Sequence, residues 1–342
     1  MPLSTQNFSI VIVTFKSESV IDQCLRSIGN NIQIIIIENS NNKKFKREIE
    51  KRYKNVKCYL SKKNLGMGAG NNLGIKYAKT DYVLILNPDV ILKKEAINEI
   101  KLAAKKKPSF TIIAPISSNK NYPNYKLYKK QEEGLKKIKL LKVKSVDGFA
   151  MLLNIKKIAQ GKNMKKFNIF DENFFMYLEN DDLCRRLKDE NIYIATRAKI
   201  NHLGGKAVNQ KYYNEVELSR NWHWIWSKFY FNRKHNGFFI AVISGLPNYF
   251  SAIFKLIFYF VVNNNFKNKI YFNRASGFFN ALLNNPSWYR PKIDDLDKSQ
   301  LALLDDICEE CKNKDISVSQ NLILNGLKIC KSCKVSKTIF PA

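Results

Sequence analysis

The chain has 342 residues, enough for a full α/β core with an extension, and its 45% hydrophobic content excludes a disordered protein. The formal net charge of +29 predicts affinity for polyanions such as nucleic acid, an anionic membrane surface or a phosphate-bearing substrate. The apolar run from Phe8 is too short for a secretory signal, so the seven cysteines predict a reducing compartment and no disulfides.

In chain order, apolar runs that predict buried strands alternate with helical patterns. Strands are expected at 8–15, 32–37, 56–61, within 81–90 and at 110–116, with helices at 20–28, 43–54, up to 78, and from 92 to 107. Repeated βα units are typical of a doubly wound, mostly parallel sheet of the α/β class.

Polar residues follow several of these strands. The apolar run within 81–90 stops at Asn87-Pro88-Asp89, because proline offers no ladder donor and Asn and Asp favour turns. Glu38 likewise follows the strand at 32–37. Open α/β sheets bind ligands at the carboxyl ends of their strands, so we expect the loops at Thr14, Glu38, Asn64 and Asp89 to converge there.

A glycine-rich loop is predicted from Asn64 to Asn72, leading into a helix that runs to Ala78. Its alternating Gly66, Gly68 and Gly70 match neither the Rossmann nor the Walker pattern. The stretch is either an ordinary loop or one whose small residues let the backbone and the asparagine amides approach a ligand closely.

The densest polar cluster of the chain lies in Phe170–Arg186. Glu179, Asp181 and Asp182 crowd into four positions, where they repel one another unless a cation or a catalytic role compensates. Capping of a helix is the simpler alternative. Further on, His202 ends a predicted strand beside two glycines.

Seven motifs in fixed order then suggest a family. SIVIVTF, IIIENS, NLGMGAGNN, LILNPDV, VDGFAM, FDENFFMYLENDDLCRR and NHLGG lie within residues 8–205. Together they resemble family 2 glycosyltransferases, and within them the rhamnosyltransferase-like bacterial enzymes of surface polysaccharide synthesis. The resemblance implies a GT-A fold and inverting transfer from a nucleotide-activated sugar to an acceptor hydroxyl.

The resemblance also implies site residues. Asp89 matches the metal-binding acid, with His202 as a possible second ligand, and Mg²⁺ or Mn²⁺ would neutralise the departing diphosphate. The residues expected to bind the nucleotide sugar are Thr14, Phe15, Glu18, Glu38, Asn39, Asn64, Gly66, Asn71, Asn72 and Asn87.

The catalytic base is where the chain departs from the family pattern. The family's Glu-Asp pair reads Glu179-Asn180 here, so no carboxylate stands at the position usually given the proton. We predict Glu179 as the base, with Asp182 and then Asp181 as alternatives, and we expect crowding to raise the pKa of at least one of these acids. A transferase-like fold that has lost catalysis is the competing hypothesis.

The region after the motifs is aromatic and basic. A helix is expected at 212–226, and the apolar stretch 238–262 is interrupted by Gly245, Pro247 and Lys255, which favours a helical hairpin lying in a membrane interface over a crossing helix. A helical subdomain packed on the sheet is an alternative of nearly equal weight.

The tail contains two Cys-x-x-Cys pairs, Cys308 with Cys311 and Cys330 with Cys333, separated by eighteen residues (312 to 329). This spacing predicts a four-cysteine structural zinc site, although four unrelated cysteines are an alternative.

We therefore predict three regions: a GT-A domain at 1–210 (nucleotide half 8–116, acceptor half 117–210), a helical membrane-associating region at 211–290, and the tail at 291–342. The expected function is transfer from dTDP-rhamnose or another nucleotide sugar to a glycan or lipid-linked acceptor, in the cytoplasm at the inner face of the bacterial plasma membrane. A basic nucleic-acid-binding protein with a zinc ribbon is the less favoured alternative.

Overall fold

The computed structural model describes residues 7–119, 123–128, 139–161, 168–188, 190–293, 307–315, 317–318 and 329–333. The chain divides into two compact units, Met1–Arg290 and Pro291–Ala342.

The first unit is built on a nine-stranded sheet with the order β3-β2-β1-β4-β10-β6-β11-β5, in which β8 also pairs with β11. Pairing is parallel among β1–β4 and between β6 and β11, whereas β10, β5 and β8 run antiparallel to their neighbours. The predicted mostly parallel α/β sheet is thus confirmed. The strands are β1 (Phe8–Thr14), β2 (Gln33–Glu38), β3 (Val56–Leu60), β4 (Tyr82–Leu86), β5 (Val90–Leu92), β6 (Ile112–Ser117), β8 (Leu140–Lys142), β10 (Ala150–Asn154) and β11 (Ile192–His202).

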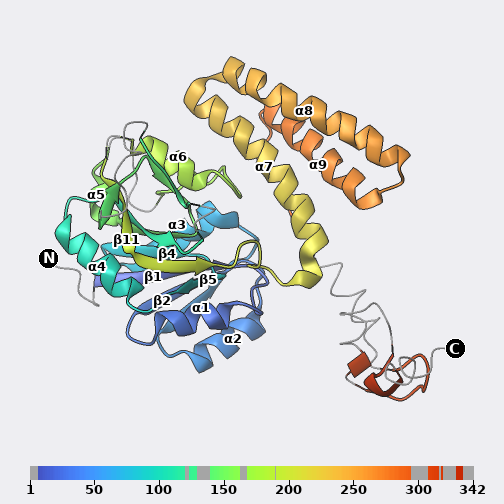
Figure 1. Cartoon of the computed structure of the whole chain (residues 1–342), viewed down its shortest axis with the longest axis horizontal. Helices are drawn as coiled ribbons and strands as arrows, with labels where there is room; N and C mark the ends of the chain where they lie inside the picture. Colours follow the sequence, from blue (N-terminus) through green and yellow to red (C-terminus); the bar gives the residue numbers. More distant parts are fainter. Residues whose placement is uncertain are drawn as a thin grey trace. The chain divides into compact units, whose positions relative to one another are not determined.

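Helices cover both faces of this sheet (Figure 1). Ile10 and Ile12 of β1 belong to one buried cluster with side chains of α1, α2 and α4, while Val11 and Val13 belong to a second cluster with α3, α5 and α6. Burial on both faces explains why these strands are continuous apolar runs. The helices are α1 (Ile21–Ile28), α2 (Lys43–Arg52), α3 (Gly66–Ala78), α4 (Ala96–Lys106), α5 (Ile155–Ala159) and α6 (Glu179–Arg186), and a small second sheet pairs β7 (Tyr125–Lys126) with β9 (Ser145–Val146).

The glycine-rich stretch is helical from Gly66 onward, so the prediction of a loop through Asn72 is wrong. A Cβ on Gly70 would lie 2.9 Å from Val13 of β1, and one on Gly74 would meet Val11. The glycines therefore let α3 lie directly on the sheet, and this packing outweighs the low helix propensity of glycine.

Three long helices follow the sheet: α7 (Tyr213–Asn236), α8 (Phe238–Val261) and α9 (Asn265–Leu282). They lie side by side and share their own buried cluster, which contains Trp222, Phe229 and Phe278 (Figure 1). The helix expected at 212–226 continues to Asn236. The stretch 238–262 is one helix with Pro247 inside it, and not a hairpin, because packing against α7 and α9 supports the helix through the proline.

Candidate active site

The turn after β4 and the end of β11 lie side by side at the carboxyl edge of the sheet. His202, the last residue of β11, pairs with Val90 of β5, and the Leu203 N–H donates to the carbonyl of Asp89 at 3.0 Å. This pairing places His202 Nε2 at 3.4 Å from Asp89 Oδ1. Asp89 and His202 thus lie side by side although they are 113 positions apart in the sequence.

Asp89 is 2% exposed, and neither of its carboxylate oxygens has a hydrogen-bond partner among the residues that the structure describes. The side-chain oxygen of Asn87 is buried and unpartnered in the same way. Leaving such groups unpaired costs about 1–3 kcal/mol each, and more for a charge. Buried oxygens beside an imidazole fit a hard divalent cation that shares its remaining ligands with a diphosphate.

Glu38 and Glu18, both predicted to bind the nucleotide, are joined to the turn after β2. The Glu38 carboxylate accepts hydrogen bonds from Ser40 N (3.0 Å), Ser40 Oγ (2.5 Å) and Asn42 N (2.7 Å). Asn42 Nδ2 in turn donates to Glu18 Oε1 at 3.0 Å. Glu38 therefore holds the shape of this loop, and its contact with a ligand stays a prediction.

Thr14 and Phe15 occupy the neighbouring loop at the end of β1. Thr14 is buried, with its hydroxyl 3.5 Å from the Ile37 carbonyl, and Phe15 is partly buried, with its N–H donating to Ser17 Oγ at 3.2 Å. The loop is also held by the Asn209 N–H, which donates to the Lys16 carbonyl at 2.9 Å.

The predicted asparagines have different surroundings. Asn72 donates to Asn168, Phe170 and Glu172 and accepts from the Phe170 N–H, so it ties α3 to the segment before the acidic cluster. The Asn64 side chain accepts from the Gly66 N–H.

Asn39 Nδ2 donates to the Gly66 carbonyl at 3.1 Å, which joins the end of β2 to the start of α3. The side-chain oxygens of Asn39 and Asn71 are buried and have no partner in the described chain, which leaves both able to receive a ligand donor.

Glu179 is the first residue of α6, and the two residues before it are strained. Tyr177 and Leu178 have φ values of +70° and +67°, a left-handed conformation that costs about 1–3 kcal/mol for a non-glycine residue. Glu179 is 9% exposed, and its Oε2 is unpartnered within the described residues. Burial raises the pKa of Glu179 to about 7, and the nearby charge of Asp181 adds to the increase.

The other two acids of the cluster have cationic partners. Asp182 is fully buried and lies 2.8 Å from Arg186 Nε, 2.6 Å from Lys234 Nζ and 2.9 Å from His235 Nε2. Asp181 pairs with Lys126 at 2.7 Å. Of the three predicted catalytic acids, Glu179 is thus the one without an ion-pair partner among the described residues.

The sequence did not point to Lys234 and His235, because they lie on α7, more than 50 residues beyond the acid that they contact. Asp147, which directly follows β9 and precedes Gly148, was also not among the predicted site residues. The pKa of Asp147 is raised overall. Burial is the largest cause and the charge of Asp181 adds to it, while Lys126 and His202 act in the opposite direction. An acid-glycine pair after a strand is the local signal that was available.

Asn180, at the position where the resemblance implies the base, is partly buried. Its Nδ2 donates to the Val146 carbonyl at 2.9 Å, and a Cβ on Gly148 would lie 3.2 Å from the Asn180 Cβ. An amide can make this hydrogen bond, whereas an ionised carboxylate cannot donate.

Comparison with known families gives a match over residues 9–185, more than half of the chain, to the model described as glycosyl transferase family 2. The chain belongs to glycosyl transferase family 2. The predicted family and the predicted enzyme class, a glycosyltransferase, are therefore confirmed.

Two relatives illustrate this membership in family 2. The chain is 26% identical over 220 residues to the low-salt glycan biosynthesis hexosyltransferase Agl10 of Haloferax volcanii, covering 60% of this chain and 69% of that protein. It is 27% identical over 207 residues to the rhamnosyltransferase WbbL of Escherichia coli, covering 52% of this chain and 75% of that protein.

Among solved structures, GalNAc-T7 with UDP, GalNAc and Mn²⁺ aligns with 72% of this chain and 57% of its own length, at 13% identity and a TM-score of 0.48. Residues 1–349 of Staphylococcus aureus TarS align with 83% of this chain and 93% of that one, at 13% identity and a TM-score of 0.44.

Proposed function

We propose that this protein transfers a sugar from a nucleotide-activated donor to a hydroxyl of a glycan or lipid-linked acceptor, with inversion, as one step in assembling a cell-surface polysaccharide. The observation that supports a metal-assisted donor site is the buried, unpartnered carboxylate of Asp89 beside His202. A bound Mg²⁺ or Mn²⁺ would stabilise the negative charge on the leaving diphosphate. The name of the Escherichia coli relative, a rhamnosyltransferase, supports rhamnose as one candidate for the transferred sugar.

The chain's own acid performs the proton transfer in this proposal. With its pKa raised to about 7, a substantial part of Glu179 is ionised at neutral pH, and it is basic enough to accept the proton of the acceptor hydroxyl. The acceptor oxygen forms its bond to the anomeric carbon as the bond from that carbon to the diphosphate oxygen breaks. Attack from the side opposite the leaving group inverts the configuration.

Donor binding is tested by thermal shift of the full-length protein with a panel of nucleotide sugars, each with and without Mn²⁺ or Mg²⁺. We expect one donor class to raise the melting temperature when the metal is present, because a ligand at a hundredfold excess over its Kd stabilises the folded state by about 2.7 kcal/mol. Equal shifts with and without metal would contradict the metal-assisted site. A panel without any shift would contradict the donor site itself.

We also propose that α8 lies in the surface of a membrane. Phe239, Ile243, Phe250, Phe254, Ile257 and Val261 are 59% to 80% exposed. At 3.6 residues per turn they fall within about 60° of one another around the helix, and we call them the α8 stripe. The two buried residues of α8, Ala241 and Ala252, lie on the opposite face, toward the neighbouring helices. A one-sided apolar face of this kind suits burial in lipid.

Cations near both ends of α8 favour a lipid occupant with an anionic headgroup. Arg233 lies over the ring of Phe238 at 5.8 Å, and Lys267 lies over the ring of Tyr259 at 5.0 Å. The helix α8 has 24 residues and contains an 18-residue stretch with a mean hydropathy of 1.5, so it is long and apolar enough to cross a bilayer. However, it packs along α7 and α9, which carry Lys and Arg side chains that a crossing would also draw into the hydrocarbon. We therefore favour an in-plane position.

Replacing both Phe250 and Phe254 by serine is expected to weaken binding of the full-length protein to vesicles of phosphatidylglycerol and phosphatidylcholine by roughly tenfold or more. Each phenylalanine contributes about 1.5–3 kcal/mol when fully buried and less at an interface. The matched control is Leu102→Ser, which changes an apolar residue of α4 that is 58% exposed. Cosedimentation measures the binding. Equal binding of the double variant, or a stable dimer that binds no vesicles, would refute the membrane proposal.

A further inference from the structure

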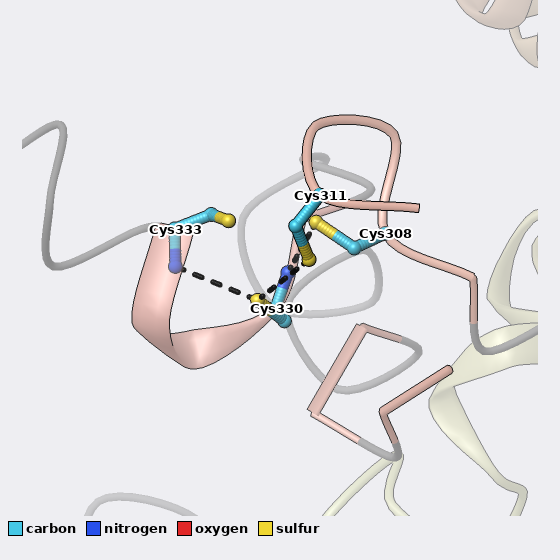
Figure 2. A group of neighbouring side chains, drawn as sticks. All are labelled: Cys308, Cys311, Cys330 and Cys333. Carbon is cyan, nitrogen blue, oxygen red and sulfur yellow. Dashed lines mark hydrogen bonds between the residues drawn. The ribbon is translucent and has the colours of Figure 1, made fainter. Parts of the chain in front are cut away.

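The second unit contains four cysteines that the topology brings together. Cys308 and Cys311 belong to one short segment and Cys330 and Cys333 to another, and their four sulfur atoms all lie within 4.8 Å of one another. Figure 2 shows the sulfurs facing one another from the two segments. None of these residues belongs to the family match, which ends at residue 185.

The spacing of the sulfurs is that of a tetrahedral metal site. Zinc binds thiolate sulfur at about 2.3 Å, so two sulfurs on a regular tetrahedron stand about 3.8 Å apart. The Cys311 and Cys330 sulfurs are 3.8 Å apart. Four thiols whose sulfurs lie this close together are also the complete ligand set of a closed structural site, which leaves no open position for catalysis.

Backbone N–H groups hold the sulfurs in these positions. The Cys330 N–H donates to Cys308 Sγ at 3.3 Å, and the Cys333 N–H donates to Cys330 Sγ at 3.5 Å (Figure 2). The first segment is closed by the Cys308 N–H donating to the Asn313 carbonyl at 2.9 Å, and Lys312 adopts a left-handed φ of +59° within that turn. Such N–H donors orient the thiolates of a metal site and offset their charge.

The described part of this unit has little apolar core of its own. Its buried cluster consists of Cys308, Val318, Ile329 and Cys330, with Cys333 packed against it, so most of its members are the cysteines themselves. A cluster of this size contributes little stability by itself, and small domains commonly add a metal or a cross-link. Three of the four cysteines, Cys308, Cys330 and Cys333, therefore belong to this small core or pack against it.

From these observations we infer that Cys308, Cys311, Cys330 and Cys333 bind one Zn²⁺ ion, which holds the second unit folded and takes no part in sugar transfer. Zinc suits four soft thiolate ligands in tetrahedral geometry. The exposed Lys312, Lys314 and Lys331 lie next to the ligands in the sequence and reduce the double negative charge of a zinc ion with four thiolates. This inference is independent of the proposed transferase function.

Elemental analysis of the full-length protein, purified without added metal and without a metal-binding tag, is the direct test. We expect about one zinc per chain. The variant with Cys308→Ser and Cys330→Ser should contain none. The matched control is Cys58→Ala, which removes a buried cysteine of β3 outside the cluster and should leave the zinc in place.

A chelator should make the segment 307–333 sensitive to protease, while the donor-dependent thermal shift of the first unit stays unchanged. Cobalt added to chelated wild-type protein should give the visible absorption of a tetrahedral thiolate site, which tests the ligands without any substitution. Absence of zinc, zinc retained in the double variant, iron in its place, or disulfides among these four cysteines in the purified protein would each overturn the inference.

Discussion

Replacing Glu179 by glutamine is expected to lower the rate of sugar transfer by about a hundredfold or more and to leave donor binding nearly unchanged. Glutamine keeps the size and hydrogen-bonding shape of the side chain and removes its basicity. Glu179 is the predicted acid that combines burial, a pKa raised to about 7 and an oxygen without a partner among the described residues. The transfer rate at saturating donor and the donor Kd measure the two effects separately.

The pH dependence gives a second measurement of the same role. A base must be unprotonated to work, so the wild-type rate should rise as the pH increases through about 7 and then level off. The matched control is Asp181→Asn, because Asp181 is paired with Lys126, whose side chain is 65% exposed, and its loss should affect the rate much less. A Glu179→Gln variant that retains most of its activity would assign the base to another residue.

A substitution at Asn180 tests whether the natural protein is an active enzyme or an impaired one. Because the Asn180 amide donates to the Val146 carbonyl, Asn180→Asp would replace this donor with a carboxylate that faces a carbonyl oxygen. We therefore expect this variant to be no faster than the wild type. A sharp increase in its rate would place the base at position 180 and make the natural protein an impaired transferase.

Replacing Asp89 by alanine is expected to abolish transfer and to remove the metal dependence of nucleotide-sugar binding. Its buried, unpartnered carboxylate is the strongest candidate ligand at the carboxyl edge of the sheet. Without ligand, the variant should be at least as stable as the wild type, because the substitution removes a buried carboxylate whose oxygens make no hydrogen bond among the described residues. Transfer assays and melting temperatures with and without Mn²⁺ measure these effects.

The control for Asp89 is Asp22→Ala, which removes an acid of α1 that pairs with Arg52 at the surface and should leave transfer unchanged. Asp89→Asn provides a variant of the same size in case the alanine variant does not fold. Unchanged turnover and metal dependence in either folded Asp89 variant would remove this residue from the mechanism.

Local sequence patterns determined the sheet and the polar turn after β4 at its carboxyl edge. Continuous apolar runs such as Phe8–Thr14 and Tyr82–Leu86 are buried on both faces, and the Asn-Pro-Asp turn after β4 lies at the end of its strand. These features depend on the periodicity of neighbouring residues and on the inability of proline to continue a strand, so they can be read without tertiary contacts.

Other features depend on contacts between distant parts of the chain, and only the tertiary structure determined them. The glycines of α3 are helical because they pack on Val11 and Val13, and α8 passes through Pro247 because α7 and α9 support it. The acids at 179, 181 and 182 look alike in the sequence, yet Lys234 and His235 reach Asp182 from α7 while Glu179 is buried without a cation among the described residues. A carboxylate takes its pKa and its role from the charges and solvent around it, and distant parts of the chain supply these only after folding.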